Sequence, residues 1–191
     1  MKAETFTSLR GQVLLAMPGM GDERFTRSVI LLMAHDDEGA MGFVLNQPAE
    51  GATLGDILKN LPPEVADTGL KNLPVFIGGP VQLDNGFVLH TTEYGKDENN
   101  FSAQLPAKMS RSMEILNDAA RGTGPKQMRF YIGYSGWDAG QLEKELQNNV
   151  WLVSPCHSET LFTHEPQRLY GDYVARLGID LSALSQEGGE A

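Results

Sequence analysis

Residues 128–146 read MRFYIGYSGWDAGQLEKEL and contain a complete change of backbone pattern. The apolar run Met128–Tyr134 predicts a buried strand, and the two glycines flanking Trp137 predict a turn. Asp138 is followed three residues later by Gln141, which is typical of a capping box and predicts a helix capped by the Asp138 side chain. Ligands often bind where a strand passes into a helix, so this stretch is the first place to look for a site.

The rest of the chain predicts short strands first and helices later. The expected strands are Gln12–Met17, Ser28–His35, Ala40–Gln47, Val75–Ile77, Gly86–Thr91 and Val150–Val153. One helix is expected to begin after an N-cap at Thr53 and to include Leu61. A second is expected around Met113, Leu116 and Ala120, and a third over Pro166–Leu177. We expect two hairpins, one of Ser28–His35 with Ala40–Gln47 and one of Val75–Ile77 with Gly86–Thr91. The first of these strands is apolar enough to be buried on both faces. This order predicts a mixed or antiparallel α+β sheet rather than a doubly wound parallel one.

Composition predicts one domain and a reducing compartment. The chain has 191 residues, of which 41% are hydrophobic and 21% charged, and we assign residues 1–186 to the domain and 187–191 to a flexible acidic tail. The longest purely apolar run, Val29–Ala34, is too short to span a membrane, and the N-terminus does not resemble a secretory signal. A single cysteine, Cys156, excludes an intramolecular disulfide. The expected location is the cytoplasm.

The charge balance argues against nucleic acid as a partner. The formal net charge is −10 and the isoelectric point is about 4.8, so most of the surface repels phosphates. One segment, Lys108–Arg129, is rich in lysine and arginine and is interpreted as a solvated helix face and loop. A regulator that binds DNA directly through this segment is therefore the disfavoured alternative.

No residue stands out as catalytic or as a metal ligand. Ser135 sits between a strand and a helix, but Trp137 occupies a position where a hydrolase elbow requires glycine. Cys156 has His157 beside it, and adjacent residues in an extended segment point to opposite faces. His35 begins an acidic turn that lacks the spacing of a zinc or calcium site. The sequence predicts no catalytic residue, no metal and no cofactor.

A small-molecule pocket is the functional alternative to a purely structural glycine turn. Two glycines before a proline at residues 78–80 fit a tight strand-end turn, and they also fit a backbone nest that approaches a ligand closely. Polar groups at the ends of the neighbouring strands would complete such a pocket. Its candidate residues are His35, Asn46, Gly78, Gly79, Pro80, His90 and Trp137.

The ordered motifs of the chain resemble those of the AlgH/YqgE family of bacterial proteins, from residue 8 to about residue 180. The motifs are the segment Gly11–Pro18 with Met20, Asp22 and Phe25; Ser28-Val-Ile; His35; Gly39-Ala-Met-Gly42; Asn46 before Pro48; Gly78-Gly-Pro-Val81; Leu89-His90; Gly136-Trp137; Gly140-Gln-Leu-Glu143; and Trp151.

The resemblance implies a fold and only a general function. The fold it implies is a bent sheet, partly rolled into a barrel and flanked by helices. The function it implies is a regulator, and we expect such a protein to act indirectly through a protein or small-molecule partner. No catalytic residue, cofactor or ligand can be transferred from the family. An enzyme with a pocket near Asn46, Gly78–Pro80 and His90 remains the alternative, although we consider a non-enzymatic role the better interpretation.

Overall fold

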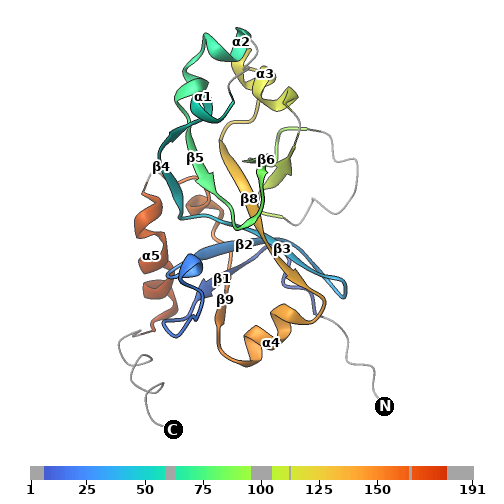
Figure 1. Cartoon of the computed structure of the whole chain (residues 1–191), viewed down its shortest axis with the longest axis vertical. Helices are drawn as coiled ribbons and strands as arrows, with labels where there is room; N and C mark the ends of the chain where they lie inside the picture. Colours follow the sequence, from blue (N-terminus) through green and yellow to red (C-terminus); the bar gives the residue numbers. More distant parts are fainter. Residues whose placement is uncertain (1–6, 59–62, 96–104, 112, 164, 180–191) are drawn as a thin grey trace.

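The long strand β8 (Met128–Asp138) joins the two halves of one mixed sheet (Figure 1). The computed structural model describes residues 7–58, 63–95, 105–111, 113–163 and 165–179. Within these ranges the sheet has nine strands, and its main order is β4-β5-β8-β3-β2-β1-β9. The first part of β8 pairs with β5 and β6, and its last residues pair with β3. The fold is a single α+β domain, as the sequence predicted.

The antiparallel half of the sheet is formed by strands that are close to the expected ones. They are β1 (Gln12–Ala16), β2 (Val29–Asp36), β3 (Gly39–Val44) and β9 (Trp151–Pro155). The β2–β3 hairpin is confirmed by the pairs Ile30↔Val44 and Asp36↔Gly39. β3 ends at Val44 rather than Gln47, and the chain continues into β4, which the sequence did not predict.

The other half contains β4 (Pro48–Thr53), β5 (Pro74–Ile77), β6 (Val81–His90) and β7 (Lys108–Ser110). β5 runs parallel to β8 with Phe76 opposite Tyr131, whereas β6 runs antiparallel to β8. The predicted hairpin of β5 with β6 is wrong, because each of these strands pairs with β8 instead of with the other. The turn at residues 78–80 carries the chain across to its new position.

The barrel that the resemblance implied is not formed. β4 and β9 stand at opposite ends of the strand order, and the described residues contain no pairing between them. The sheet bends where β8 passes from one group of neighbours to the other. Gly133 lies at this point with a φ of +65°, and a Cβ atom there would stand 2.5 Å from the Gly79 carbonyl oxygen. The sheet is therefore open.

Short helices cover the sheet at both ends. They are α1 (Leu54–Ile57), α2 (Pro63–Ala66), α3 (Glu114–Ala120), α4 (Gln141–Gln147) and α5 (Leu169–Leu177), with 3₁₀ turns η1 (Glu23–Phe25), η2 (Gly69–Asn72), η4 (Ser158–Thr160) and η5 (Pro166–Arg168). Thr53 caps α1 as predicted, in a capping box with Asp56. The helix ends at Ile57, earlier than expected, and the predicted Leu61 lies outside the described residues.

The start of α4 differs from the prediction. β8 continues through Trp137 to Asp138, so the expected turn around Trp137 is strand. The N-cap of α4 is Gly140 in the left-handed region at φ 73°, with no side-chain cap. Only the reverse half of the capping box forms, because the Gln141 side chain accepts a hydrogen bond from the Asp138 N–H at 3.0 Å. Glycine takes the capping position because it adopts a positive φ without a steric cost.

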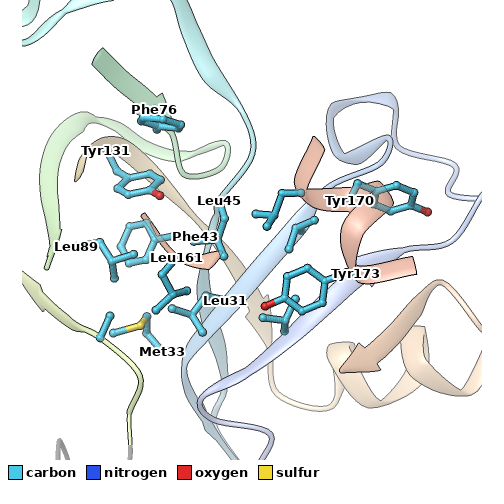
Figure 2. Close-up of a cluster of buried hydrophobic side chains, with 14 of the residues drawn as sticks. Leu31, Met33, Phe43, Leu45, Phe76, Leu89, Tyr131, Leu161, Tyr170 and Tyr173 are labelled. Carbon is cyan, nitrogen blue, oxygen red and sulfur yellow. The ribbon is translucent and has the colours of Figure 1, made fainter. Parts of the chain in front are cut away.

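β2 is buried on both faces over its first five residues, as its apolar run predicted. One face packs against α5, and Figure 2 shows Tyr173 reaching from this helix toward Leu31, while the Tyr170 ring points away from Leu31. The other face carries Ile30 and the two tryptophans of the chain.

The described helices include none that is long and apolar enough to cross a membrane. The predicted tail at residues 187–191 lies outside the described residues.

Candidate functional site

A cavity of about 270 Å³ lies where η1, the turn after β5, β8, α4 and β9 meet, and we call it the two-tryptophan cavity. Residues from segments far apart in the sequence contribute to its wall. They are Met20, Asp22, Arg24, Phe25, Pro80, Gly136, Trp137, Gln141, Glu145, Val150 and Trp151. All of them except Arg24, Glu145 and Val150 belong to the motifs that carry the family resemblance. The fold thus gathers the separate motifs around a single hollow.

The Glu145 carboxylate is held in place by three N–H donors. Its Oε2 atom accepts hydrogen bonds from the indole nitrogens of Trp137 at 2.8 Å and Trp151 at 2.6 Å. Its Oε1 atom accepts from the Gln141 amide at 2.8 Å, one helical turn earlier on α4. A carboxylate offers about four acceptor positions, so at least one remains for a further donor. This arrangement fixes a negative group on the wall of an aromatic cavity.

Three aromatic rings pack edge to face around this carboxylate. The Trp137 and Trp151 ring centres lie 5.9 Å apart at an interplanar angle of 76°. Phe25 meets Trp151 at 5.8 Å, also at 76°. Both tryptophans are more than nine-tenths buried. Because edge-to-face packing and the bonds to Glu145 restrain both indoles, the cavity is preorganised.

The surroundings of the cavity are acidic. At its mouth Asp22 pairs with Arg24 at 2.6 Å, and the hydrogen bond from Arg24 lowers the pKa of the Asp22 carboxyl. A second hollow of about 390 Å³ shares Gly136 and Trp137 with the first. Its wall adds three carboxylates, from Asp36, Glu38 and Asp138. The two hollows together therefore present five carboxylates and a single basic side chain, which Asp22 already neutralises.

Of the seven residues predicted from the sequence, Pro80 and Trp137 line the two-tryptophan cavity. His35 lines a different hollow, of about 530 Å³, on the other side of β2's end. Its ring accepts the Leu9 N–H at 2.9 Å and contacts the Glu143 carboxylate at 2.9 Å. This buried histidine ties the N-terminal segment and α4 to β2.

Gly78 and Gly79 are buried against the backbone of β8. A Cβ atom on Gly78 would stand 2.4 Å from the Gly133 carbonyl oxygen, and one on Gly79 would stand 2.4 Å from the Ser135 nitrogen. Ser135 is itself buried and donates its hydroxyl to the Gly78 carbonyl at 3.0 Å. The close approach that the glycines permit is thus an approach to β8. This contact places Pro80 beside the cavity.

Asn46 and His90 use their polar groups within the fold. Asn46 accepts the Val29 N–H and donates to the Arg27 carbonyl, both at 2.9 Å. Both His90 ring nitrogens have partners at 3.0 Å, the Thr91 carbonyl and the Ser110 hydroxyl. Burial lowers the pKa of His90. These two residues make structural contacts in separate parts of the sheet.

The lone cysteine and the basic segment do not form the sites that were considered for them, a reactive thiol and a nucleic-acid patch. Burial raises the pKa of the Cys156 thiol to about 11, so the reactive thiolate is disfavoured. In the basic segment, Arg129 is buried and Lys108 donates to the carbonyls of Tyr94 and Gly95. No group of three His, Cys, Asp or Glu side chains within the described ranges could hold a metal ion.

Sequence reasoning missed Glu145, the residue at the centre of the site. One signal was available, since the chain contains two tryptophans and a buried indole N–H needs an acceptor. Glu145 follows Gln141 at the i,i+4 spacing, which places both side chains on the same face of α4. That both indoles reach the same oxygen could not be inferred without the strand order β8-β3-β2-β1-β9, which brings β8 and β9 into one sheet.

Comparison with known proteins agrees with the motifs. The family described as AlgH-like matches residues 13–182. The chain is 41% identical over 195 residues to a UPF0301 protein of Stutzerimonas stutzeri, and 38% identical over 192 residues to the UPF0301 protein AlgH of Pseudomonas aeruginosa. Both alignments cover all of this chain and all of the relative.

Solved structures give the same result. The solution structure of the AlgH protein from Pseudomonas aeruginosa matches with a TM-score of 0.74 and 38% identity, over the full length of both chains. The crystal structure of protein DIP2367 from Corynebacterium diphtheriae matches with a TM-score of 0.67 over 92% of this chain and 91% of that one. At 22% identity the second likeness concerns the fold alone. The matched residues and the relatives that align along the full chain show that this protein belongs to the AlgH-like family.

Proposed function

We propose that this protein is a non-enzymatic binding protein that receives a cationic side chain of a partner protein in the two-tryptophan cavity. Through that partner it acts on gene expression indirectly, without contacting DNA. The observation that carries the proposal is the Glu145 carboxylate, fixed by two indole N–H groups and an amide on the wall of an aromatic hollow.

Charge and aromatic character both favour a cation. A cation over an indole ring gains about 0.5–2 kcal/mol, and more where water is excluded. Beyond the Asp22–Arg24 pair, the four other carboxylates of the two adjoining hollows add a negative field that attracts positive groups and repels anions. An anionic ligand would have to approach Glu145 against this field. A lysine or arginine side chain satisfies both features.

Size favours a protein side chain over a whole metabolite. At about 270 Å³ the cavity lies just below the range of roughly 300–1,000 Å³ that is usual for drug-sized ligands. It suits one cationic head group. The neighbouring acidic hollow continues the same surface and would receive further basic residues of an extended segment. We therefore assign the partner to proteins with an exposed basic segment.

Tryptophan fluorescence tests the proposal directly, because Trp137 and Trp151 are the two tryptophans of the sequence and both line the cavity. Hexalysine and choline are titrated into the protein, with 3,3-dimethylbutan-1-ol as the uncharged isostere of choline. We expect a saturable change of emission with both cations and none with the alcohol. An equal response to the alcohol would show that charge is not recognised.

Matched variants locate the response. Glu145→Gln removes the charge of the cavity and is expected to weaken hexalysine binding by about tenfold or more. Glu143→Gln removes the same charge from the same helix, yet this residue faces His35 outside the cavity, so binding should stay near that of the native protein. Unchanged binding in Glu145→Gln would overturn the proposal. Binding of choline without hexalysine would replace the protein partner by a small ammonium compound.

A further inference from the structure

A larger cavity lies near α3, at the far end of the sheet from α4 (Figure 1). Its volume is about 780 Å³, and segments from both halves of the chain line it. The wall is formed by Pro48, Leu70, Leu73, Pro74, Phe76, Ala119, Gly122, residues 124–130, Phe162, Thr163, Pro166 and Gln167. None of these residues lines the two-tryptophan cavity. The described wall contains no carboxylate and holds two cations, Lys126 and Arg129.

Arg129 is the buried charge of this cavity, with 8% of its surface exposed. One guanidinium nitrogen donates to the Leu45 carbonyl at 3.1 Å and another donates to the Thr163 carbonyl. Its guanidinium carbon lies 4.6 Å from the centre of the Phe76 ring. In the part of the chain that the structure describes, no carboxylate pairs with Arg129.

A buried guanidinium with only neutral partners is an energetic anomaly. Burying a charge is costly unless an opposite charge compensates it, and backbone carbonyls offset only part of that cost. The guanidinium has five N–H donors, and the two bonds to Leu45 and Thr163 leave others available. The Tyr131 hydroxyl is buried beside Arg129 and makes no hydrogen bond of normal geometry within the described residues. A buried guanidinium with unused donors and no described carboxylate partner thus lines a cavity of ligand size.

We infer that this cavity binds an organic carboxylate with an apolar body, whose carboxylate pairs with Arg129. The planar guanidinium matches a carboxylate in geometry and supplies the missing opposite charge. The aromatic and aliphatic side chains of the wall suit an apolar body, and the volume lies within the usual range for small-molecule sites. Exposed Lys126 adds a positive charge at the rim. This site is separate from the proposed cation site and has the opposite charge preference.

Octanoate is a suitable probe, with octan-1-ol and octyltrimethylammonium as matched ligands that lack the negative charge. Calorimetric titration of the full chain is expected to show saturable binding of octanoate and binding of the two other ligands that is at least about tenfold weaker. Equal binding of octanol would show that only the apolar wall contributes. Absence of octanoate binding would overturn the inference.

Variants separate this site from both misfolding and the other cavity. Arg129→Gln should weaken octanoate binding by about ten- to a hundredfold. Arg129 also joins two backbone segments, so its replacement could weaken binding by disturbing the fold. Ala119→Leu is therefore a second test, because the larger side chain fills the cavity from α3 without changing its charge. This variant should also reduce octanoate binding. Glu145→Gln serves as the control and should bind octanoate normally. Octanoate binding that survives Arg129→Gln in a folded protein would contradict the assignment.

Discussion

Glu145 and Asn46 illustrate how a single polar residue can organise distant segments. Glu145 receives both indole N–H groups, so one carboxylate connects α4 to β8 and β9. The Asn46 side chain accepts the Val29 N–H and donates to the Arg27 carbonyl, so it holds the backbone on both sides of Ser28. Arg27 has a φ of 56°, which is unusual for a residue with a side chain. That backbone leads directly from η1, which carries Phe25 of the cavity. Both residues act through hydrogen bonds to distant segments that no local pattern predicts.

Asn46→Ala is expected to lower the free energy of unfolding by about 1–2 kcal/mol, because it leaves the N–H of buried Val29 without a partner, whereas water can replace Asn46 at the exposed Arg27 carbonyl. Urea denaturation measures the change. Asn72→Ala, at an exposed position at the end of η2, is the control and should change stability by less than about 0.5 kcal/mol. Equal effects at the two positions would contradict the structural role of Asn46.

His90 is expected to make stability depend on pH. Burial lowers its pKa in the folded protein below the ordinary value of 6.5, so the unfolded chain binds more protons in the interval between the two values. Its contribution is therefore fully present above pH 6.5 and is lost as the pH falls toward the folded pKa. Urea denaturation between pH 7.5 and 5.5 should show a smaller loss of stability in His90→Gln than in the native protein. Identical pH profiles would count against this assignment.

At the scale of secondary-structure elements, local patterns were reliable where apolar residues repeat regularly. The β2–β3 hairpin and the cap of α1 follow from residues that are close in sequence. The two main errors, the β5–β6 hairpin and the turn at Trp137, both concern β8. Its neighbours come from three separate segments, and a glycine in a strand looks the same in sequence as a glycine in a turn. Pairing between distant strands decided both cases.

The turn after β5 gives a test at this scale. Gly79→Ala is expected to destabilise the protein by at least about 2 kcal/mol, because φ is +152° and the new Cβ would stand 2.4 Å from the Ser135 nitrogen. Thermal unfolding followed by circular dichroism measures the effect. Gly19→Ala is the matched control, since no atom lies within 4 Å of a Cβ there and its stability should hardly change. A tolerated Gly79→Ala would show that the turn can move away from β8.

At the scale of the whole molecule, charge distinguishes the two cavities. The formal net charge of −10 favours cationic partners, and the acidic hollows beside Trp137 concentrate this preference. The Arg129 cavity has the opposite character because its cation is buried within the sheet. Under the two proposals, a basic partner and an organic acid would bind at separate places.

The dependence of ligand affinity on salt concentration tests the electrostatic field of the whole molecule. Association of hexalysine should weaken by about tenfold or more between 50 mM and 500 mM NaCl, because the carboxylates around the cavity are screened within a few ångströms at high salt. Octanoate binding at the buried Arg129 should change less. Tryptophan emission for the first ligand and calorimetry for the second provide the two measurements. A salt-independent hexalysine affinity would show that the acidic surroundings play no part.

The sequence by itself determined the class of fold, the family and the apolar strands, and it named Pro80 and Trp137 among its candidate pocket residues. These conclusions follow from periodicity, ordered motifs and local chemistry. Each such pattern is formed by residues that lie within a few positions of one another in the sequence. Tertiary structure alone decided that the sheet is open, that Glu145 joins the two tryptophans, and that Arg129 is buried without a described carboxylate partner. Each of these depends on contacts between residues far apart in the chain, and local sequence carries no information about which distant groups will meet.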